Sequence, residues 1–203
     1  MIKLKKAAAA GLLWAVAFSA AGCGVKTDIS KFSENALAIN KDGSVTELAV
    51  ESFGEEYYSL EDLKAYVNAQ VDAYNAGHPA ASGKEKDQTI TVDEVAVDGD
   101  TARVVLTYES AGDYADFNYT SLEVIEAGEL SGDSAALSFK DSEGTDVGSL
   151  SAIEDLKDYH AVVSYTAHIL AVPGKIAYVS SNVNITDTSV AESDGTLSVV
   201  LYR

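Results

Sequence analysis

One stretch of helical periodicity stands among many short alternating stretches, and this pattern most constrains the fold. In residues 60–76, apolar side chains recur every three or four positions, which is typical of a helix with one buried face. Ser59, with Asp62 three positions on, is a helix-capping start, and Gly77 and Pro79 end the helix. Elsewhere, short alternating runs separated by tight turns predict antiparallel strands. The sequence therefore predicts an α+β domain in which one long helix packs across an antiparallel sheet.

Two hairpins are the clearest strand pairs. Residues 36–51 contain Lys41-Asp42-Gly43, and residues 90–108 contain Asp98-Gly99-Asp100. Both are tight-turn sequences between alternating apolar runs. The alternation changes phase at Asp93-Glu94, which predicts a β-bulge in the second hairpin.

The C-terminal part is also expected to be rich in strands. Residues 161–169 alternate without interruption, which predicts a single strand. Val172-Pro173-Gly174-Lys175 carries Pro and Gly at the positions that a type II turn requires. Residues 197–202 are apolar on both faces, as in a central strand, whereas residues 111–118 predict one or two helical turns.

Tyrosine is unusually common, with 11 residues against 5 Phe and 1 Trp. Four of these tyrosines fall on predicted apolar faces and are expected in the core: Tyr66, Tyr74, Tyr108 and Tyr165. Tyr57 and Tyr58 follow two glutamates just before the helix. We interpret this pair as a possible exposed contact site, because exposed aromatic side chains stack on sugars and grip protein partners.

The first 22 residues have the three parts of a secretory signal. Three lysines lie within the first six positions, an apolar run of about 14 residues follows, and small residues come next. The run is shorter than the ~20 residues that a membrane-spanning helix needs. We therefore expect residues 1–22 to direct export and to be removed.

The only cysteine, Cys23, directly follows Ala20-Ala21-Gly22. This arrangement resembles the lipobox of a bacterial lipoprotein precursor, although Ala20 stands where that family more often has Leu. The resemblance implies a diacylglycerol on the sulfur of Cys23, cleavage before it and attachment to the outer face of the cell membrane. The alternative is an ordinary signal peptide whose removal leaves a free thiol.

The expected layout has three parts. Residues 1–22 are the lipoprotein signal peptide, and residues 23–33 are the lipidated cysteine with a polar spacer. Residues 34–203 are a single α+β extracytoplasmic domain. Fully extended, the spacer would reach about 33 Å from the lipid. The texture of the exported part resembles that of the uncharacterised surface lipoproteins of Gram-positive-type bacteria, a resemblance that implies no activity.

Charge and cysteine content exclude several classes of protein. Asp and Glu number 32 against 14 Lys and Arg, which gives a formal net charge of −18. So acidic a chain argues against a nucleic-acid partner. It would also be repelled by anionic lipid headgroups, so the lipid alone is expected to hold it at the membrane. A single cysteine excludes a disulfide framework within the chain.

No motif for catalysis or for binding a cofactor stands out. His78 follows the predicted helix, where a capping role is expected. On a single strand, His160 and His168 would stand about 26 Å apart, too far to bind one ion. Residues 141–146 faintly resemble a calcium loop but lack its distal Glu, and we interpret them as a turn. Neither a G-x-S-x-G elbow nor a phosphate-binding loop is present, so we predict no cofactor and no metal.

Two functional hypotheses follow. The first is a non-enzymatic, membrane-anchored surface lipoprotein that binds a protein or a cell-wall glycan. The alternative is an extracytoplasmic hydrolase that acts on glycan through paired carboxylates. A deep cleft with two converging acids would favour the hydrolase, whereas exposed aromatic side chains would favour the binding protein. A transport solute-binding protein is disfavoured because such proteins usually have two larger lobes.

Overall fold

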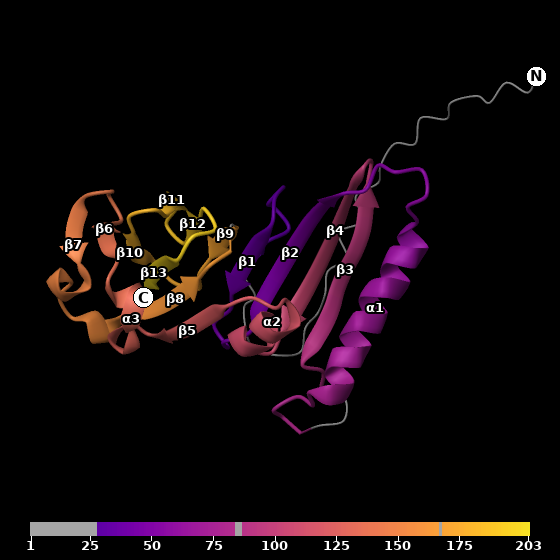
Figure 1. The fold of residues 1–203 in the computed structure, drawn as a ribbon, viewed down its shortest axis with the longest axis horizontal. Coiled ribbons are helices and arrows are strands. Elements are labelled where there is room, and N and C mark those ends of the chain that lie inside the picture. Colours follow the sequence, from indigo (N-terminus) through magenta and orange to yellow (C-terminus); the bar gives the residue numbers. More distant parts are fainter. Residues whose placement is uncertain (1–27, 84–86, 167) are drawn as a thin grey trace, which may run out of the picture.

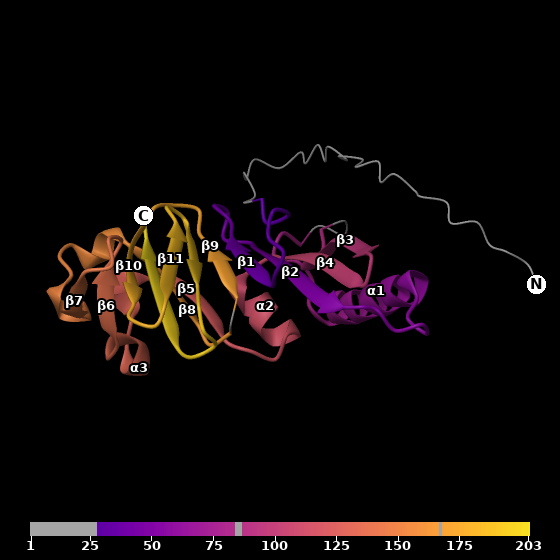
Figure 2. The same ribbon diagram turned by 90° about the horizontal axis from the view of Figure 1, so that it is seen from above.

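The computed structural model describes residues 28–83, 87–166 and 168–203. Two mostly antiparallel sheets and one long helix make up the fold, which confirms the predicted α+β class. The structure thus has two sheets where the sequence predicts one, and both predicted hairpins lie in the larger sheet. The molecule is elongated, with helix α1 (Leu60–Gly77) at one end and many of the C-terminal strands at the other (Figures 1 and 2).

The larger sheet has seven strands in the order β11-β12-β9-β1-β2-β4-β3. They are β1 (Ala36–Ile39), β2 (Val45–Ser52), β3 (Ile90–Asp98), β4 (Thr101–Tyr108), β9 (Ile169–Ala171), β11 (Asn184–Asp187) and β12 (Val190–Glu192). β1 and β9 are parallel, and every other pairing within the described ranges is antiparallel. Both predicted hairpins are confirmed. The register of β3 against β4 shifts between Val92 and Glu94, which confirms the bulge.

The smaller sheet has six strands in the order β5-β8-β13-β10-β6-β7. They are β5 (Leu122–Glu126), β6 (Ser138–Asp141), β7 (Asp146–Ser149), β8 (His160–Ser164), β10 (Ile176–Ser180) and β13 (Ser198–Tyr202). All five residues of β13 are buried, and the strand pairs with β8 on one side and β10 on the other. The prediction of a central C-terminal strand is therefore confirmed.

Side chains from both sheets meet in one apolar core. Leu37 and Ile39 of β1 belong to the same buried cluster as Val162 of β8 and Val200 of β13. On the opposite face of the smaller sheet, a second cluster forms around residues such as Phe139. Strands β8 and β13 are therefore buried on both faces, which explains why they are apolar at nearly every position.

Helix α1 begins and ends where the sequence predicts. The Ser59 hydroxyl accepts a hydrogen bond from the Asp62 N–H at 3.4 Å, and His78 caps the C-terminal end. The helix packs on edge strand β3, to which Asn75 holds it. The Asn75 amide donates to the Ile90 carbonyl at 2.9 Å and accepts from the Ile90 N–H at 2.8 Å. The shorter helices are α2 (Ala111–Phe117) and α3 (Gly132–Ala135), with 3₁₀ turns η1 (Ala127–Glu129), η2 (Leu150–Ala152) and η3 (Leu156–Asp158).

Two of the four tyrosines expected in the core are not there. Tyr108 is fully buried and Tyr74 is half-buried, as predicted, but Tyr66 is 64% exposed and Tyr165 is 50% exposed. Only a narrow strip of α1 around Val71 rests on the sheet, so Tyr66 is left at the surface. Tyr165 lies in the connection between β8 and β9.

The single strand predicted for residues 161–169 is wrong. The chain leaves the smaller sheet after Ser164 and enters the larger sheet at Ile169, so His160 and His168 belong to different parts of the fold. Between the two strands, the Ser164 hydroxyl accepts from the Thr166 N–H at 3.2 Å. Because β8 is buried on both faces, its side chains give no in–out pattern that could mark where the strand ends.

The type II turn predicted at residues 172–175 is also wrong. Gly174 does not have the positive φ that the third position of such a turn requires. Glycine is needed there for another reason: a Cβ atom would lie 2.5 Å from the Arg203 carbonyl oxygen. The backbones of Lys175 and Arg203 exchange two hydrogen bonds beside it, of 2.8 and 3.1 Å.

Residues 28–33, which we expected to belong to the spacer, are attached to the larger sheet. Ile29 is 3% exposed and packs with residues such as Leu48 on the sheet face away from the core. The Arg103 guanidinium donates to the carbonyls of Ser30 and Phe32, at 3.1 and 3.0 Å. The C-terminal part of the expected spacer therefore belongs to the folded body.

Replacing Gly174 with Ala should destabilise the protein by about 1–3 kcal/mol, because the new methyl group overlaps the Arg203 backbone, which is held by hydrogen bonds. Urea denaturation measures the change. Gly128→Ala is the matched control, since no heavy atom lies within 4 Å of its added Cβ and its φ is not positive. Equal stability of the two variants would contradict the proposed role of Gly174.

Candidate functional site

A groove lies between α1 and α2, above the face of β4. Its volume is about 720 Å³, within the range of small-molecule binding sites. Val104 and Leu106 of β4 contribute its apolar wall. The remaining lining residues come from α1 and α2 and from the residues that directly follow each helix: Tyr66, Val67, Gln70, Ala73, Tyr74, His78, Asp116, Phe117 and Tyr119. Figure 1 shows the two helices beside this part of the sheet. We call this cavity the aromatic groove.

Tyr74 is the central ring of the groove. Its ring stacks on His78, with centroids 4.0 Å apart and planes at 12°, and meets Phe117 in a T-shaped contact at 5.6 Å. The Tyr74 hydroxyl donates to Asp113 Oδ1 at 3.3 Å. Burial, together with the negative charges of Asp113 and Asp116, raises the pKa of Tyr74 to about 12. The phenol is therefore neutral at physiological pH, and the local potential is negative.

Tyr119 stands at the rim of the groove in an unusual backbone conformation. Its φ is 52°, in the left-handed region, and its side chain is 98% exposed. It directly follows the C-cap of α2, where the Thr120 N–H donates to the Ala115 carbonyl at 3.0 Å. Glycine usually occupies this position in such a helix ending, and a larger residue costs roughly 1–2 kcal/mol. The fold therefore retains a strained tyrosine whose ring contributes almost no burial.

The two carboxylates near the groove are in different situations. Asp113 supports the cap of α2: the Ser110 hydroxyl at the N-cap accepts from the Asp113 N–H at 3.1 Å and donates to the Asp113 carboxylate at 2.5 Å. Asp116 is exposed and forms no hydrogen bond or ion pair with any residue that the structure describes. Asp116 is therefore available to a ligand, whereas Asp113 serves the helix.

A half-buried carboxyl, Glu47, lies beneath α2. Its Oε2 accepts from the Tyr108 hydroxyl at 2.5 Å and from the Asn118 amide at 3.4 Å. Burial raises the pKa of Glu47 despite these two hydrogen bonds, which act in the opposite direction. A carboxyl with a raised pKa has the character of a general acid. This hydrogen-bonded group contains one carboxyl, whereas paired-acid glycan hydrolysis needs two, roughly 5–9 Å apart.

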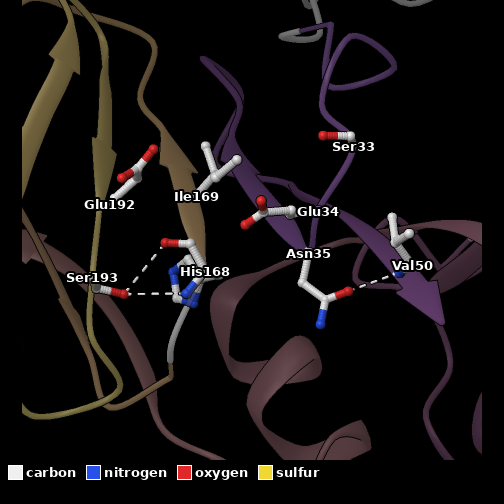
Figure 3. Close-up of a pocket in the computed structure, with 8 residues that line it drawn as sticks. All are labelled: Ser33, Glu34, Asn35, Val50, His168, Ile169, Glu192 and Ser193. Carbon is white, nitrogen blue, oxygen red and sulfur yellow. Dashed lines mark hydrogen bonds between the residues drawn. The ribbon is translucent and has the colours of Figure 1, made fainter. Parts of the chain in front are cut away.

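A second cavity, of about 400 Å³, lies where β1 and β9 pair. Figure 3 shows residues from β9 and β12 on one side and from the start of β1 on the other. The side-chain oxygen of Asn35 already has a partner within the fold, because its Oδ1 accepts a hydrogen bond from the Val50 N–H at 2.7 Å. Glu34 and Glu192 also line the cavity. Across the described ranges, no three His, Cys, Asp or Glu side chains are grouped so that they could hold a metal ion.

His168 lies beside this cavity but is almost fully buried, at 8% exposure. The Ser193 hydroxyl accepts a hydrogen bond from the His168 N–H and donates one to the His168 carbonyl (Figure 3). Within the described part of the chain, neither nitrogen of the His168 ring has a hydrogen-bond partner. The ring borders an enclosed void of about 10 Å³ between the sheets. The other residues around the void are serines and aliphatic residues: Val162, Ser164, Leu170, Val183, Ala191, Ser193, Ser198 and Val200. Burial lowers the pKa of His168 to about 4.

The tyrosines chosen from the sequence lie outside the groove. Tyr57 and Tyr58 are exposed before α1, as expected, and form an aromatic stack with Phe53. The Phe53 and Tyr58 rings stack with centroids 4.8 Å apart. Cys23 lies outside the described residues. Sequence reasoning did not select Asp116 or Tyr119, because it took residues 111–118 only as helical turns.

The remaining candidates have ordinary structural roles. His78 caps α1 and also lines the groove, with Nδ1 3.0 Å from the Tyr74 carbonyl oxygen. His160 lies at the surface, 3.2 Å from Glu126. Asp141 Oδ1 accepts from the N–H groups of Glu143 and Thr145, both at 2.9 Å. The segment that faintly resembles a calcium loop is thus a hairpin turn.

Comparison of the chain with protein families, with curated proteins and with solved structures finds no match. Among the described residues, no helix combines the length and the apolar character that crossing a membrane requires. The aromatic groove remains the largest cavity described above and the one richest in exposed aromatic side chains.

Acid should destabilise the fold through His168. Its imidazole has a pKa of about 4 in the folded protein and 6.5 as an ordinary group, so the unfolded chain takes up the proton first. The contribution of His168 to the free energy of unfolding is nearly constant above pH 6.5 and falls by about 3 kcal/mol as the pH drops from 6.5 to 4.

Chemical denaturation of the wild type and of His168→Leu across this pH range tests the prediction. The difference between them should grow as the pH falls, because the variant has no imidazole to protonate. A pH-independent difference for His168→Leu would count against the prediction.

Proposed function

We propose that the protein is a lipid-anchored, extracytoplasmic binding module whose ligand site is the aromatic groove. One observation carries this proposal: Tyr119 is held almost fully exposed, in a strained conformation, at the rim of a groove lined by further aromatic rings. A backbone outlier that contributes nothing to packing is a reason to look for function. Exposed aromatic rings beside an apolar cavity are typical of binding sites.

The lipid anchor rests on the sequence. The signal in residues 1–22 and the cysteine at its end support attachment of Cys23 to the outer face of the cell membrane. Two acyl chains suffice for stable attachment. Because Ile29 is buried, the free tether is shorter than the sequence suggested. From Cys23 to Asp28, five residues can span at most about 18 Å.

The position of this tether also favours binding of a ligand from outside. The segment 28–33 lies on the face of the larger sheet opposite α1 and α2, since Ile29 packs with Val105 whereas Val104 lines the groove. The first described residues therefore lie on the face opposite the groove, so attachment at the N-terminal side does not require the groove to face the membrane. This arrangement leaves the groove free for a ligand in the cell wall or in the medium.

The alternative, a glycan hydrolase, has one observation in its favour, the raised pKa of Glu47. Under this alternative, Glu47 donates the proton to the leaving sugar. However, Glu47 already accepts hydrogen bonds from the Tyr108 hydroxyl and the Asn118 amide, and Glu47 does not line the groove. Loss of sugar-releasing activity in a Glu47→Gln variant would establish the alternative.

Replacing Cys23 with Ala should release the protein from membranes into the medium, because no thioether lipid can form. Fractionation of cells followed by immunoblotting measures this. High salt should not release the wild-type protein, because so acidic a body gains nothing from anionic headgroups. Retention of the variant in the membrane fraction, or release of the wild type by salt, would contradict the anchor.

Replacing Tyr119 with Gly should weaken ligand binding while raising stability by up to about 1 kcal/mol, since glycine relieves the left-handed strain. The probe is soluble peptidoglycan fragments, measured by calorimetry with the lipidated full-length protein in nonionic detergent. Urea denaturation of the same samples measures stability.

Tyr57→Ala is the matched control, because it removes another exposed tyrosine outside the groove. It should leave binding of the fragments unchanged. If Tyr57→Ala weakens binding and Tyr119→Gly does not, the contact site is the Tyr57–Tyr58 pair and the groove is not the ligand site.

A further inference from the structure

The charges around the aromatic groove have one sign. Asp116 lines the groove and has no partner among the described residues. Asp113 stands behind Tyr74, and both carboxylates act on that phenol, as its raised pKa shows. Among the residues that the structure describes, neither a Lys nor an Arg lines the groove. An anionic ligand would therefore be repelled, whereas a cation gains from an unpaired carboxylate.

The aromatic rings of the groove also favour a cationic ligand. The face of a tyrosine or phenylalanine ring carries partial negative charge and attracts ammonium groups within about 6 Å. Tyr66 and Tyr119 offer exposed rings, and Phe117 also lines the groove, where it contacts Tyr74 of the stacked Tyr74–His78 pair. Several rings with one carboxylate are the combination that organic ammonium ions prefer.

The charge of the whole chain reinforces this local preference. A formal net charge of −18 raises the concentration of cations near the surface and speeds their encounter with the protein. This field acts on any cation, so it does not by itself select the groove. Val104 and Leu106 make the groove selective, because a ligand with an apolar part beside its charge gains free energy by burying that part against them.

We propose that the aromatic groove binds an organic ammonium group, with the charge between Asp116 and the rings of Tyr66 and Tyr119 and the apolar part of the ligand against β4. This inference rests on the proposed function, because it names the ligand class of the same site. A neutral sugar would use the rings but would gain little from the unpaired carboxylate.

Choline and its neutral isostere 3,3-dimethylbutan-1-ol test the inference, because they share a shape and differ in charge. The full-length lipidated protein, with ¹³C-labelled tyrosine, is titrated in a polyoxyethylene detergent and followed by NMR. Choline should shift the ring signals of Tyr66 and Tyr119, and the isostere should bind at least about fivefold more weakly.

Two charge variants locate the effect. Asp116→Asn should weaken choline binding by about fivefold and leave the isostere unchanged. Asp72→Asn is the matched control, since it removes the same charge from an exposed position on α1 that does not line the groove. It should change choline binding by less than about twofold, because solvent screens the more distant charge.

Four results would overturn the inference: choline fails to shift the two rings, the isostere binds equally well, Asp72→Asn matches Asp116→Asn, or tetra-N-acetylchitotetraose binds the groove more tightly than choline. None of these would remove the proposed function by itself. That function fails only if none of the probes, peptidoglycan fragments, choline and tetra-N-acetylchitotetraose, binds through Tyr119, so the two failures are distinguishable.

Discussion

The parallel pairing of β1 with β9 is the contact on which the rest of the structure depends. β1 comes from the start of the folded body and β9 from its C-terminal third, and all four residues of β1 are buried. The pairing extends the N-terminal strands into a seven-stranded sheet. It also brings Leu37 and Ile39 over the apolar face of the six-stranded sheet, where one core can form. Without it, each half would expose an apolar sheet face to water.

The aromatic groove follows from how this sheet is covered. Helix α1 rests on the edge strand β3, held there by Asn75, and α2 covers the end of β4 near Tyr108. Neither helix covers Val104, so an apolar strip of β4 remains between them. Tyr74 of α1 and Phe117 of α2 also line the groove, where their rings meet in a T-shaped contact, and Tyr119 lines it as well. The site is thus a gap between two helices that the sheet holds apart.

The interior also contains polar groups that reduce stability. His168 has no hydrogen-bond partner on its ring, and Glu47 keeps a carboxyl under α2. Their pKa values are lowered and raised, respectively, because burial disfavours the charged form of both groups. The two groups respond to acid in opposite ways: protonation charges the imidazole and neutralises the carboxyl. The strain at Tyr119 is a third cost, and it is the one placed at the candidate site.

Local patterns in the sequence determined the α+β class, the α1 helix with its Ser59 cap, both hairpins, the bulge and the buried strand β13. Each of these depends on residues that are close together in the chain. Tertiary structure alone decided that residues 161–169 divide between two sheets, because their alternation is the same on either side of the turn. It also decided that Gly174 meets the C-terminus and that Ile29 packs on the sheet. The groove joins residues from α1, β4 and α2, and no local pattern encodes how far apart two helices are held.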